Sequence, residues 1–339
     1  MKRTLAFVLT MLMMLSLSAC GGVNLNFTGV SPFRNIRDEA VNAQVDTLVS
    51  AFADEHGLEG ISAGVISGKE TRFVNIGEGM GEHTVMPIGT MTNMFVGMLA
   101  ADHERIGYLD RNQNVSDWLN SPVDIPQNSG EDIKVWHLAA NMSGLGDADT
   151  FDNSYLTAGM MYQQLPNSSF GFGLGEGHYE SSLGYALLSE TLRQTYNMNA
   201  NFVNLVNNQV ISKMQLNDSS FARGDSLAGF NGYQTTTYDL LKVIGYCTGA
   251  LNYDEALTKT LALAMEPVGA DSGRTLAFEY GKMGSEDKVE NYVYFRAGEM
   301  DGISSYIAFI PELDIGVSLM ARGDADLESL GAELLSVIK

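Results

Sequence analysis

Hydrophobic positions along the chain predict a helix, a hairpin, a long helical block and a final group of strands. Residues 36–56 carry apolar side chains at helical spacing, and Gly57 ends the run. Two β-rich runs, 60–67 and 71–79, lie on either side of a short Gly-Lys-Glu turn and predict a hairpin. Residues 91–107 are apolar nearly all round the helix that they would form, which is typical of a buried central helix.

Further helices are predicted up to about residue 249, and strands follow in the last quarter. The predicted helices are 114–120, 133–144, 181–196, 200–214 and 236–251, the predicted strands are 289–299, 304–312 and 314–323, and 327–339 is predicted to close the chain as a helix. This order favours an α+β fold in which both ends of the chain share one antiparallel sheet flanked by helices. We expect an α/β lobe from 36–87 and 250–339, with 88–249 inserted as a mainly helical lobe.

The N-terminus has the pattern of a secretory signal. Residues 1–19 combine a basic start with an apolar run that is short for a membrane span, and the segment leads directly to Cys20. The letters Leu-Ser-Ala-Cys resemble the lipobox of bacterial lipoproteins, which implies that Cys20 is acylated and anchors the protein in a lipid bilayer. Residues 20–35 then form a tether, and the absence of Asp at position 21 favours the outer membrane of the cell envelope.

The net charge and the numbers of cysteines and histidines limit which partners, disulfides and metal sites are expected. The net charge is −21, which argues against nucleic acid as a partner. Cys247 is the only other cysteine, so no internal disulfide is expected once Cys20 is acylated. The five histidines lack metal-ligand spacing, and no cofactor motif is present, so neither a metal nor a cofactor is predicted.

Four segments, taken in order, resemble the serine β-lactamase and penicillin-binding-protein superfamily, and class C β-lactamases in particular. They are "IGTMTNMF" (88–95), "IKVWHLAANMSGL" (133–145), "YESSLGYALL" (179–188) and "RAGEMDGISSYIAFIPELDIGV" (296–317). The resemblance covers nearly all of the chain from residue 36 onward. It implies a β-lactamase/transpeptidase-like fold and a cleft that holds a small molecule or a peptidoglycan-like ligand.

The first segment departs from the family at the two positions that carry the chemistry. Thr90 stands at the family's nucleophilic Ser, and Asn93 at the Lys one turn later that helps to deprotonate it. An amide has no accessible basic lone pair, so Asn93 is unable to take the hydroxyl proton. The alternative is that Thr90 caps the helix and Asn93 is a polar residue of its first turn.

The third segment aligns Tyr179 with the family's catalytic Tyr and Ser181 with its substrate-binding Asn. Replacing Lys by Asn93 removes one of the cations that would lower the pKa of this tyrosine. A buried aromatic with a satisfied hydroxyl is the other interpretation of Tyr179.

The fourth segment aligns its first three residues with the family's Lys-Thr-Gly strand. Arg296 keeps a positive charge that could grip a ligand carboxylate, whereas Ala297 has lost a hydroxyl. Gly298 allows close approach of the strand, and the backbone of Glu299, with that of Thr90, would form the oxyanion hole. The alternative is that Arg296 is a solvent-exposed arginine on an edge strand and binds no ligand.

Two functions remain open. One is an inactive or impaired homologue, anchored in the bacterial envelope, that acts by binding a ligand or an envelope protein. The other is a serine-hydrolase-like enzyme (an esterase, a β-lactamase or a D-Ala peptidase) that uses Thr90, Tyr179 and Arg296 in a modified mechanism. Residues at several of the family's catalytic positions differ in this chain, and this pattern favours the inactive homologue.

Overall fold

The computed structural model describes residues 31–148, 157–222, 229–283 and 291–339. The chain from Phe33 to Lys339 forms one compact unit. Its main sheet has the order β1-β3-β2-β12-β11-β10-β9-β8-β7, and all neighbours are antiparallel except β1 and β3. The strands are β1 (Arg34–Asn35), β2 (Gly60–Ser67), β3 (Glu70–Ile76), β7 (Pro267–Val268), β8 (Arg274–Thr275), β9 (Glu279–Met283), β10 (Asn291–Met300), β11 (Ile303–Ile310) and β12 (Ile315–Arg322).

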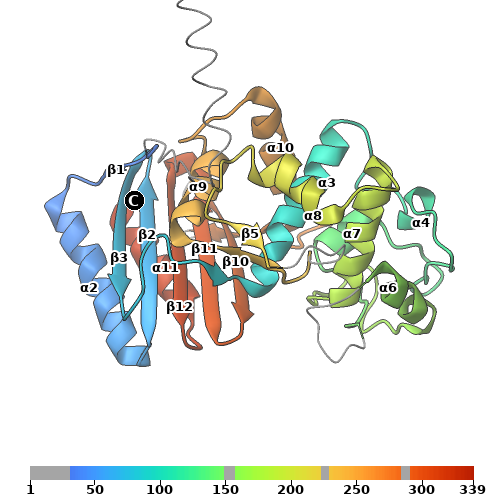
Figure 1. Cartoon of the computed structure of the whole chain (residues 1–339), viewed down its shortest axis with the longest axis horizontal. Coiled ribbons are helices and arrows are strands. Elements are labelled where there is room, and N and C mark those ends of the chain that lie inside the picture. Colours follow the sequence, from blue (N-terminus) through green and yellow to red (C-terminus); the bar gives the residue numbers. More distant parts are fainter. Residues whose placement is uncertain (1–30, 149–156, 223–228, 284–290) are drawn as a thin grey trace, which may run out of the picture. The chain divides into compact units, whose positions relative to one another are not determined.

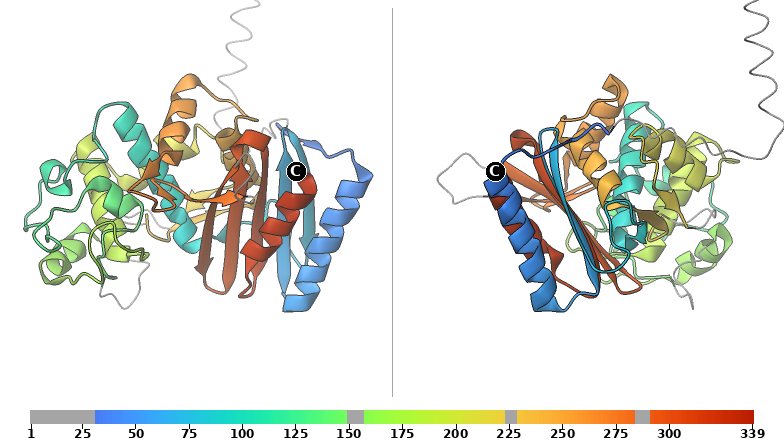
Figure 2. Two further views of the ribbon diagram at one scale, coloured as in Figure 1. Left: turned by 180° about the vertical axis from the view of Figure 1, so that it is seen from behind. Right: turned by 60° about the vertical axis from the view of Figure 1, so that its left-hand side comes forward.

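Two helices cover one face of this sheet, α2 (Glu39–His56) and α11 (Leu327–Ile338) (Figure 2). Asp38 caps α2 by accepting hydrogen bonds from the backbone of its first turn, and Gly57 ends it in the left-handed conformation. The buried side of α2 consists of Val45, Val49 and Phe52, as the helical spacing predicted. These residues join a core with the outward face of β2, β11 and β12.

The opposite face of the sheet packs against α9 (Thr237–Thr248), beyond which the remaining helices gather (Figure 1). They are α3 (Asn93–Arg105), α4 (Val115–Trp118), α5 (Val135–Ala139), α6 (Ala158–Gln164), α7 (Ser182–Tyr196), α8 (Phe202–Val206) and α10 (Glu255–Met265). Helix α3 is buried from Asn93 to His103 and contacts α5, α7, α8 and α10, so it is the central helix that its apolar sequence predicted. Strands β4 (Met86–Pro87), β5 (Ser220–Phe221) and β6 (Tyr233–Thr235) form a small second sheet in the order β4-β6-β5.

The structure confirms the predicted fold class and differs from the sequence analysis in local details. Residues 34 and 35, predicted as the end of the tether, pair with β3 as strand β1. Helix α9, assigned from the sequence to the inserted lobe, packs on the sheet, where the Thr237 hydroxyl donates to the backbone carbonyl of Ser62. Within predicted helix 200–214, the chain changes from α8 to a π-helical turn, Asn207–Ile211. Helices α6 and α10 and strands β7 to β9 were not predicted.

Some sequence predictions lie outside the described residues. These are the signal peptide 1–19, Cys20 and most of the tether. Among the described residues, no helix is both long enough and apolar enough to cross a membrane. The anchor therefore remains a prediction from the sequence.

Candidate active-site pocket

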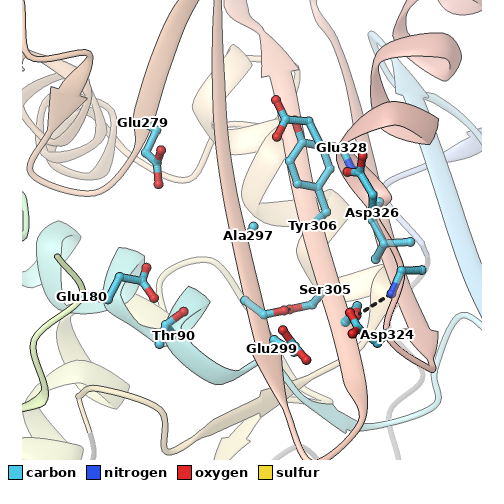
Figure 3. A pocket seen from close by; sticks show the side chains of 14 residues that line it. Thr90, Glu180, Glu279, Ala297, Glu299, Ser305, Tyr306, Asp324, Asp326 and Glu328 are labelled. Atoms are coloured by element: carbon cyan, nitrogen blue, oxygen red, sulfur yellow. Dashed lines mark hydrogen bonds between the residues drawn. The ribbon is translucent and has the colours of Figure 1, made fainter. Parts of the chain in front are cut away.

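A pocket of about 370 Å³ lies between the start of α3, strand β10 and the N-terminal end of α11 (Figure 3). Thr90 and Glu180 lie beside one another near the helix, and Ala297 and Glu299 project from β10. The lining residues are Thr90, Glu180, Glu279, Ala297, Gly298, Glu299, Ser304, Ser305, Tyr306, Asp324, Ala325, Asp326, Leu327 and Glu328. The volume is within the range of small-molecule sites.

The nucleophile segment folds as a short 3₁₀ helix, Gly89–Thr92, that continues into α3. Thr90 lines the pocket from inside this turn. The N-cap of the 3₁₀ helix is Ile88 and that of α3 is Thr92, so Thr90 caps neither helix, whereas Asn93 is in the first turn of α3 as the alternative stated. Positions three apart in a 3₁₀ turn lie one above the other, which places Asn93 directly behind Thr90. Asn93 is fully buried, and neither atom of its amide has a hydrogen-bond partner among the described residues.

The backbone around Thr90 keeps the close approach that an oxyanion hole requires. Gly89 has φ +52°, and a Cβ at this position would collide with the backbone carbonyl of Glu299. A Cβ on Gly298 would likewise collide with the carbonyl oxygen of Ile88. Two glycines therefore let the Thr90 turn sit directly against β10, next to the backbone of Glu299. The Glu299 side chain is exposed and lines the same pocket.

Arg296 is neither solvated nor on an edge strand, so the alternative of a solvent-exposed arginine at the edge of the sheet is wrong. It is 3% exposed on β10, which lies between β9 and β11. Its guanidinium pairs with Glu180 at 3.3 Å and with Glu279 at 3.6 Å, and the same Glu279 oxygen lies 2.8 Å from Arg274. Burial lowers the pKa of Arg296, but the neighbouring Glu180 and Glu279 outweigh it and hold the pKa above its ordinary value. The guanidinium of Arg296, which was predicted to bind a ligand carboxylate, is therefore already paired with two carboxylates of the protein itself.

Tyr179 and Ser181 do not line the pocket, and Glu180 takes the place expected for Ser181. Tyr179 is 46% exposed and donates its hydroxyl to Asp147, and this hydrogen bond raises the pKa of the tyrosine. Tyr179 is therefore not the buried aromatic of the alternative interpretation either. Ser181 is buried as the N-cap of α7, where its hydroxyl accepts from the backbone N–H of Gly184 at 2.8 Å and donates to the Gly146 carbonyl.

A shift of one residue explains this difference. The family's motif at this segment is Y-x-N-S-x-x-G, in which the Asn stands four residues before the Gly, and Glu180 stands four residues before Gly184. Aligned on this Gly, the position of the catalytic Tyr falls on His178 rather than Tyr179. The pKa of His178 is lowered to about 4 by desolvation and by the positive charges of Arg274 and Arg296, so the imidazole is neutral at pH 7. The N-cap preference of Ser before the apolar run at 182 was the signal that would have given this register.

Most of the acidic lining was not anticipated from the sequence. Among the described residues, six carboxylates line the pocket, those of Glu180, Glu279, Glu299, Asp324, Asp326 and Glu328. No lysine or arginine lines it in the same part of the chain. Asp326 also caps α11 by accepting from the backbone N–H of Glu328. Among the described residues, no group of three or more histidine, cysteine or acidic side chains has the arrangement of a metal site.

The fold and the pocket are those of a class of serine hydrolases. In that class the nucleophile lies at the start of a central helix, beside the sheet. The sequence matches the family profile of β-lactamases over residues 45–335, and the chain belongs to this family. A search of curated protein sequences finds no match.

Solved structures show the same fold at low sequence identity. A class C β-lactamase superposes with a TM-score of 0.76 at 16% identity, covering 90% of this chain and 98% of that one. The β-lactamase/D-alanine carboxypeptidase of Pseudomonas syringae gives 0.73 at 16% identity, with 88% and 99% covered. A class C β-lactamase of Rhodobacter sphaeroides gives 0.70 at 16% identity, with 87% and 99% covered.

Proposed function

We propose that this chain is a catalytically inactive member of the β-lactamase family that acts by binding a ligand, or an envelope protein, at its pocket. The observation that carries the proposal is Asn93, which stands where the family places its Lys and is buried without a hydrogen-bond partner among the described residues. Acyl transfer from a hydroxyl needs a group that takes its proton. An amide has none to offer, and no lysine lines the pocket in the described part of the chain.

The other two catalytic positions give the same answer. His178, which falls on the position of the family's catalytic Tyr, has no phenol, and the neighbouring Tyr179 is exposed and hydrogen-bonded to Asp147 with a raised pKa, whereas a tyrosine that accepts a proton needs a lowered pKa. Arg296 is buried against Glu180 and Glu279, so it is engaged before any ligand arrives. Loss of one member of an interdependent catalytic set costs about 10⁴–10⁶ in rate.

The modified hydrolase remains the second candidate, and one observation favours it. Thr90 keeps a hydroxyl in the pocket, and its turn still sits against the backbone of Glu299. Such a reaction would need His178 or Glu180 as the base in place of Lys. A pKa of about 4 makes His178 a weak base, because efficient general bases have pKa values near the working pH.

A labelling experiment separates the two candidates. The purified protein is incubated with a fluorescent penicillin and examined by gel and by intact mass, with Thr90→Ala as the control. We expect no covalent adduct on either protein. Stoichiometric labelling that is lost in Thr90→Ala would overturn the proposed function. A parallel screen with esters, β-lactams and D-Ala peptides includes His178→Ala, which abolishes any activity that depends on this histidine.

A restoration experiment tests whether the pocket keeps the shape of an enzyme. Thr90→Ser with Asn93→Lys supplies a primary hydroxyl and an amine at the two altered positions. A gain of esterase turnover in the double variant, absent from either single variant, indicates a recently inactivated site. No gain, with the fold intact by circular dichroism, indicates a surface already adapted to binding.

The proposal includes lipid anchoring of the protein in the bacterial envelope, in the outer membrane where the cell has two. Its support is the sequence around Cys20 and the tether-like composition that follows it. Metabolic labelling with a fatty acid and membrane fractionation test it. Both the label and the membrane fraction should be lost in Cys20→Ala, and a labelled Cys20→Ala protein would contradict the anchor.

A further inference from the structure

The charge of the pocket is opposite to the one that a carboxylate ligand requires. Glu180 and Glu279 are paired with Arg296 and Arg274. Four lining carboxylates remain, and none of them has an ion-pair partner within the described residues: Glu299, Asp324, Asp326 and Glu328. A ligand carboxylate would have to enter beside these four charges without a free cation to receive it.

One buried polar side chain next to the pocket residue Thr90 has no hydrogen-bond partner among the described residues. Asn93 lies one 3₁₀ turn behind Thr90 and is fully buried, with an amide oxygen and an amide nitrogen unpaired among the described residues. Buried polar side chains normally have hydrogen-bond partners, and each exception requires an explanation.

The pocket also offers an aromatic ring. Tyr306 lies opposite Ala297 on the neighbouring strand and is 5% exposed, with its ring among the lining groups (Figure 3). Aromatic faces attract ammonium and guanidinium groups. The loss of a hydroxyl at Ala297, where the family keeps one for the ligand carboxylate, is consistent with the same change of preference.

We infer that the pocket binds ligands through an ammonium or guanidinium group and excludes ligands that present a carboxylate. The inference rests on the proposed function, since both concern the same pocket. The carboxylates of Glu299 and Glu328 supply the attraction, and the ring of Tyr306 packs against the cation.

The test uses three probes that share a ring and a size: benzylammonium, benzyl alcohol and benzoate. Their dissociation constants are measured on the purified protein by ligand-observed NMR at 150 mM salt. We expect benzylammonium to bind at least tenfold more tightly than benzoate, with benzyl alcohol between them. Equal binding of the three probes, or tighter binding of benzoate, would overturn the inference.

Matched variants separate a pocket from the acidic surface as a whole. Glu299→Gln with Glu328→Gln removes two lining charges without touching the arginine pairs. Glu55→Gln with Glu333→Gln removes the same charge from exposed positions that do not line the pocket. We expect the first double variant to weaken benzylammonium at least fivefold and the second to change it less than twofold. Equal losses would assign the binding to the net charge of −21 and overturn the inference.

The titration is also independent of turnover. It measures occupancy, so hydrolysis of an uncharged ester that is lost in Thr90→Ala would overturn the proposed function and leave the probe ranking to be decided by its own result.

Discussion

Replacing Asn93 by alanine should stabilise the protein, which is the reverse of the usual result for a buried asparagine. The amide is fully buried and unpaired among the described residues. An unsatisfied buried polar group costs about 1–3 kcal/mol. Alanine also favours the helix by roughly 0.5 kcal/mol, since Asn93 is the first residue of α3. Against this, the small cavity left behind costs about 1 kcal/mol.

The balance is a gain of about 0.5–2.5 kcal/mol in the free energy of unfolding. The entropy of unfolding is about 2.1 cal/mol/K per residue, so for the compact unit from Phe33 to Lys339 the melting temperature should rise by roughly 1–4 °C. Urea unfolding followed by circular dichroism gives the free energy, and differential scanning calorimetry gives the melting temperature. Both measurements use the wild-type protein as reference.

Asn141→Ala is the matched control. Asn141 is also buried, and its amide nitrogen is likewise unpaired among the described residues, but its amide oxygen accepts from the backbone N–H of Ser181 at 3.2 Å, and its φ of +58° suits asparagine better than alanine. This variant should lose about 1–3 kcal/mol. A loss of more than 1 kcal/mol in Asn93→Ala as well would refute the reasoning, because it would mean that the Asn93 amide is satisfied in solution.

Three further predictions concern other parts of the molecule. Glu279→Gln removes the carboxylate shared by Arg274 and Arg296 and should lower the free energy of unfolding by about 3 kcal/mol in urea titrations; an unchanged urea midpoint would contradict this. Gly298→Ala places a methyl group against the Ile88 carbonyl and should cost about 1–3 kcal/mol, with loss of benzylammonium binding; wild-type stability would show that the strand moves away freely. Burial lowers the pKa of His103 to about 4, below its unfolded value of about 6.5, so the unfolded chain takes up the proton first as pH falls and stability is lost between about pH 6.5 and 4. His103→Gln should flatten the decline of the urea midpoint over this range, and an identical slope in both proteins would contradict the assignment.

The fold was predictable because its signals are local and periodic. The apolar spacing of α2, the two runs that form β2 and β3, and the apolar run that follows Asn93 in α3 each specify an element without reference to the rest of the chain. The packing of α9 on the sheet was not predictable in this way, because a buried helix is equally apolar in either lobe. Strands β7 and β8 are two residues long, too short for an alternating pattern to show.

The pocket was predicted only in part, since its charge depends on residues that no single motif contains. Thr90, Ala297, Gly298 and Glu299 were named from the sequence and line the pocket. A list at the level of motifs misses Glu279 and the acidic residues at the start of α11, which reach the pocket only through the pairing of β9, β10 and β11. The shift from Ser181 to Glu180 has a different cause, because a one-residue displacement before a helix moves a side chain from the pocket to the helix cap.

The pairing of β2 with β12 has a consequence for how the protein folds. Ser67 pairs with Ile315, so the centre of the sheet joins segments about 250 positions apart, and contacts of such separation slow folding. The hairpin of β2 and β3 and helix α2 emerge first during synthesis, but their apolar faces stay uncovered until β12 and α11 are available. The edge of β2 that pairs with β12 therefore stays unpaired during most of the synthesis of the chain. This unpaired edge is a natural binding site for chaperones, and a C-terminal truncation would cause aggregation there first.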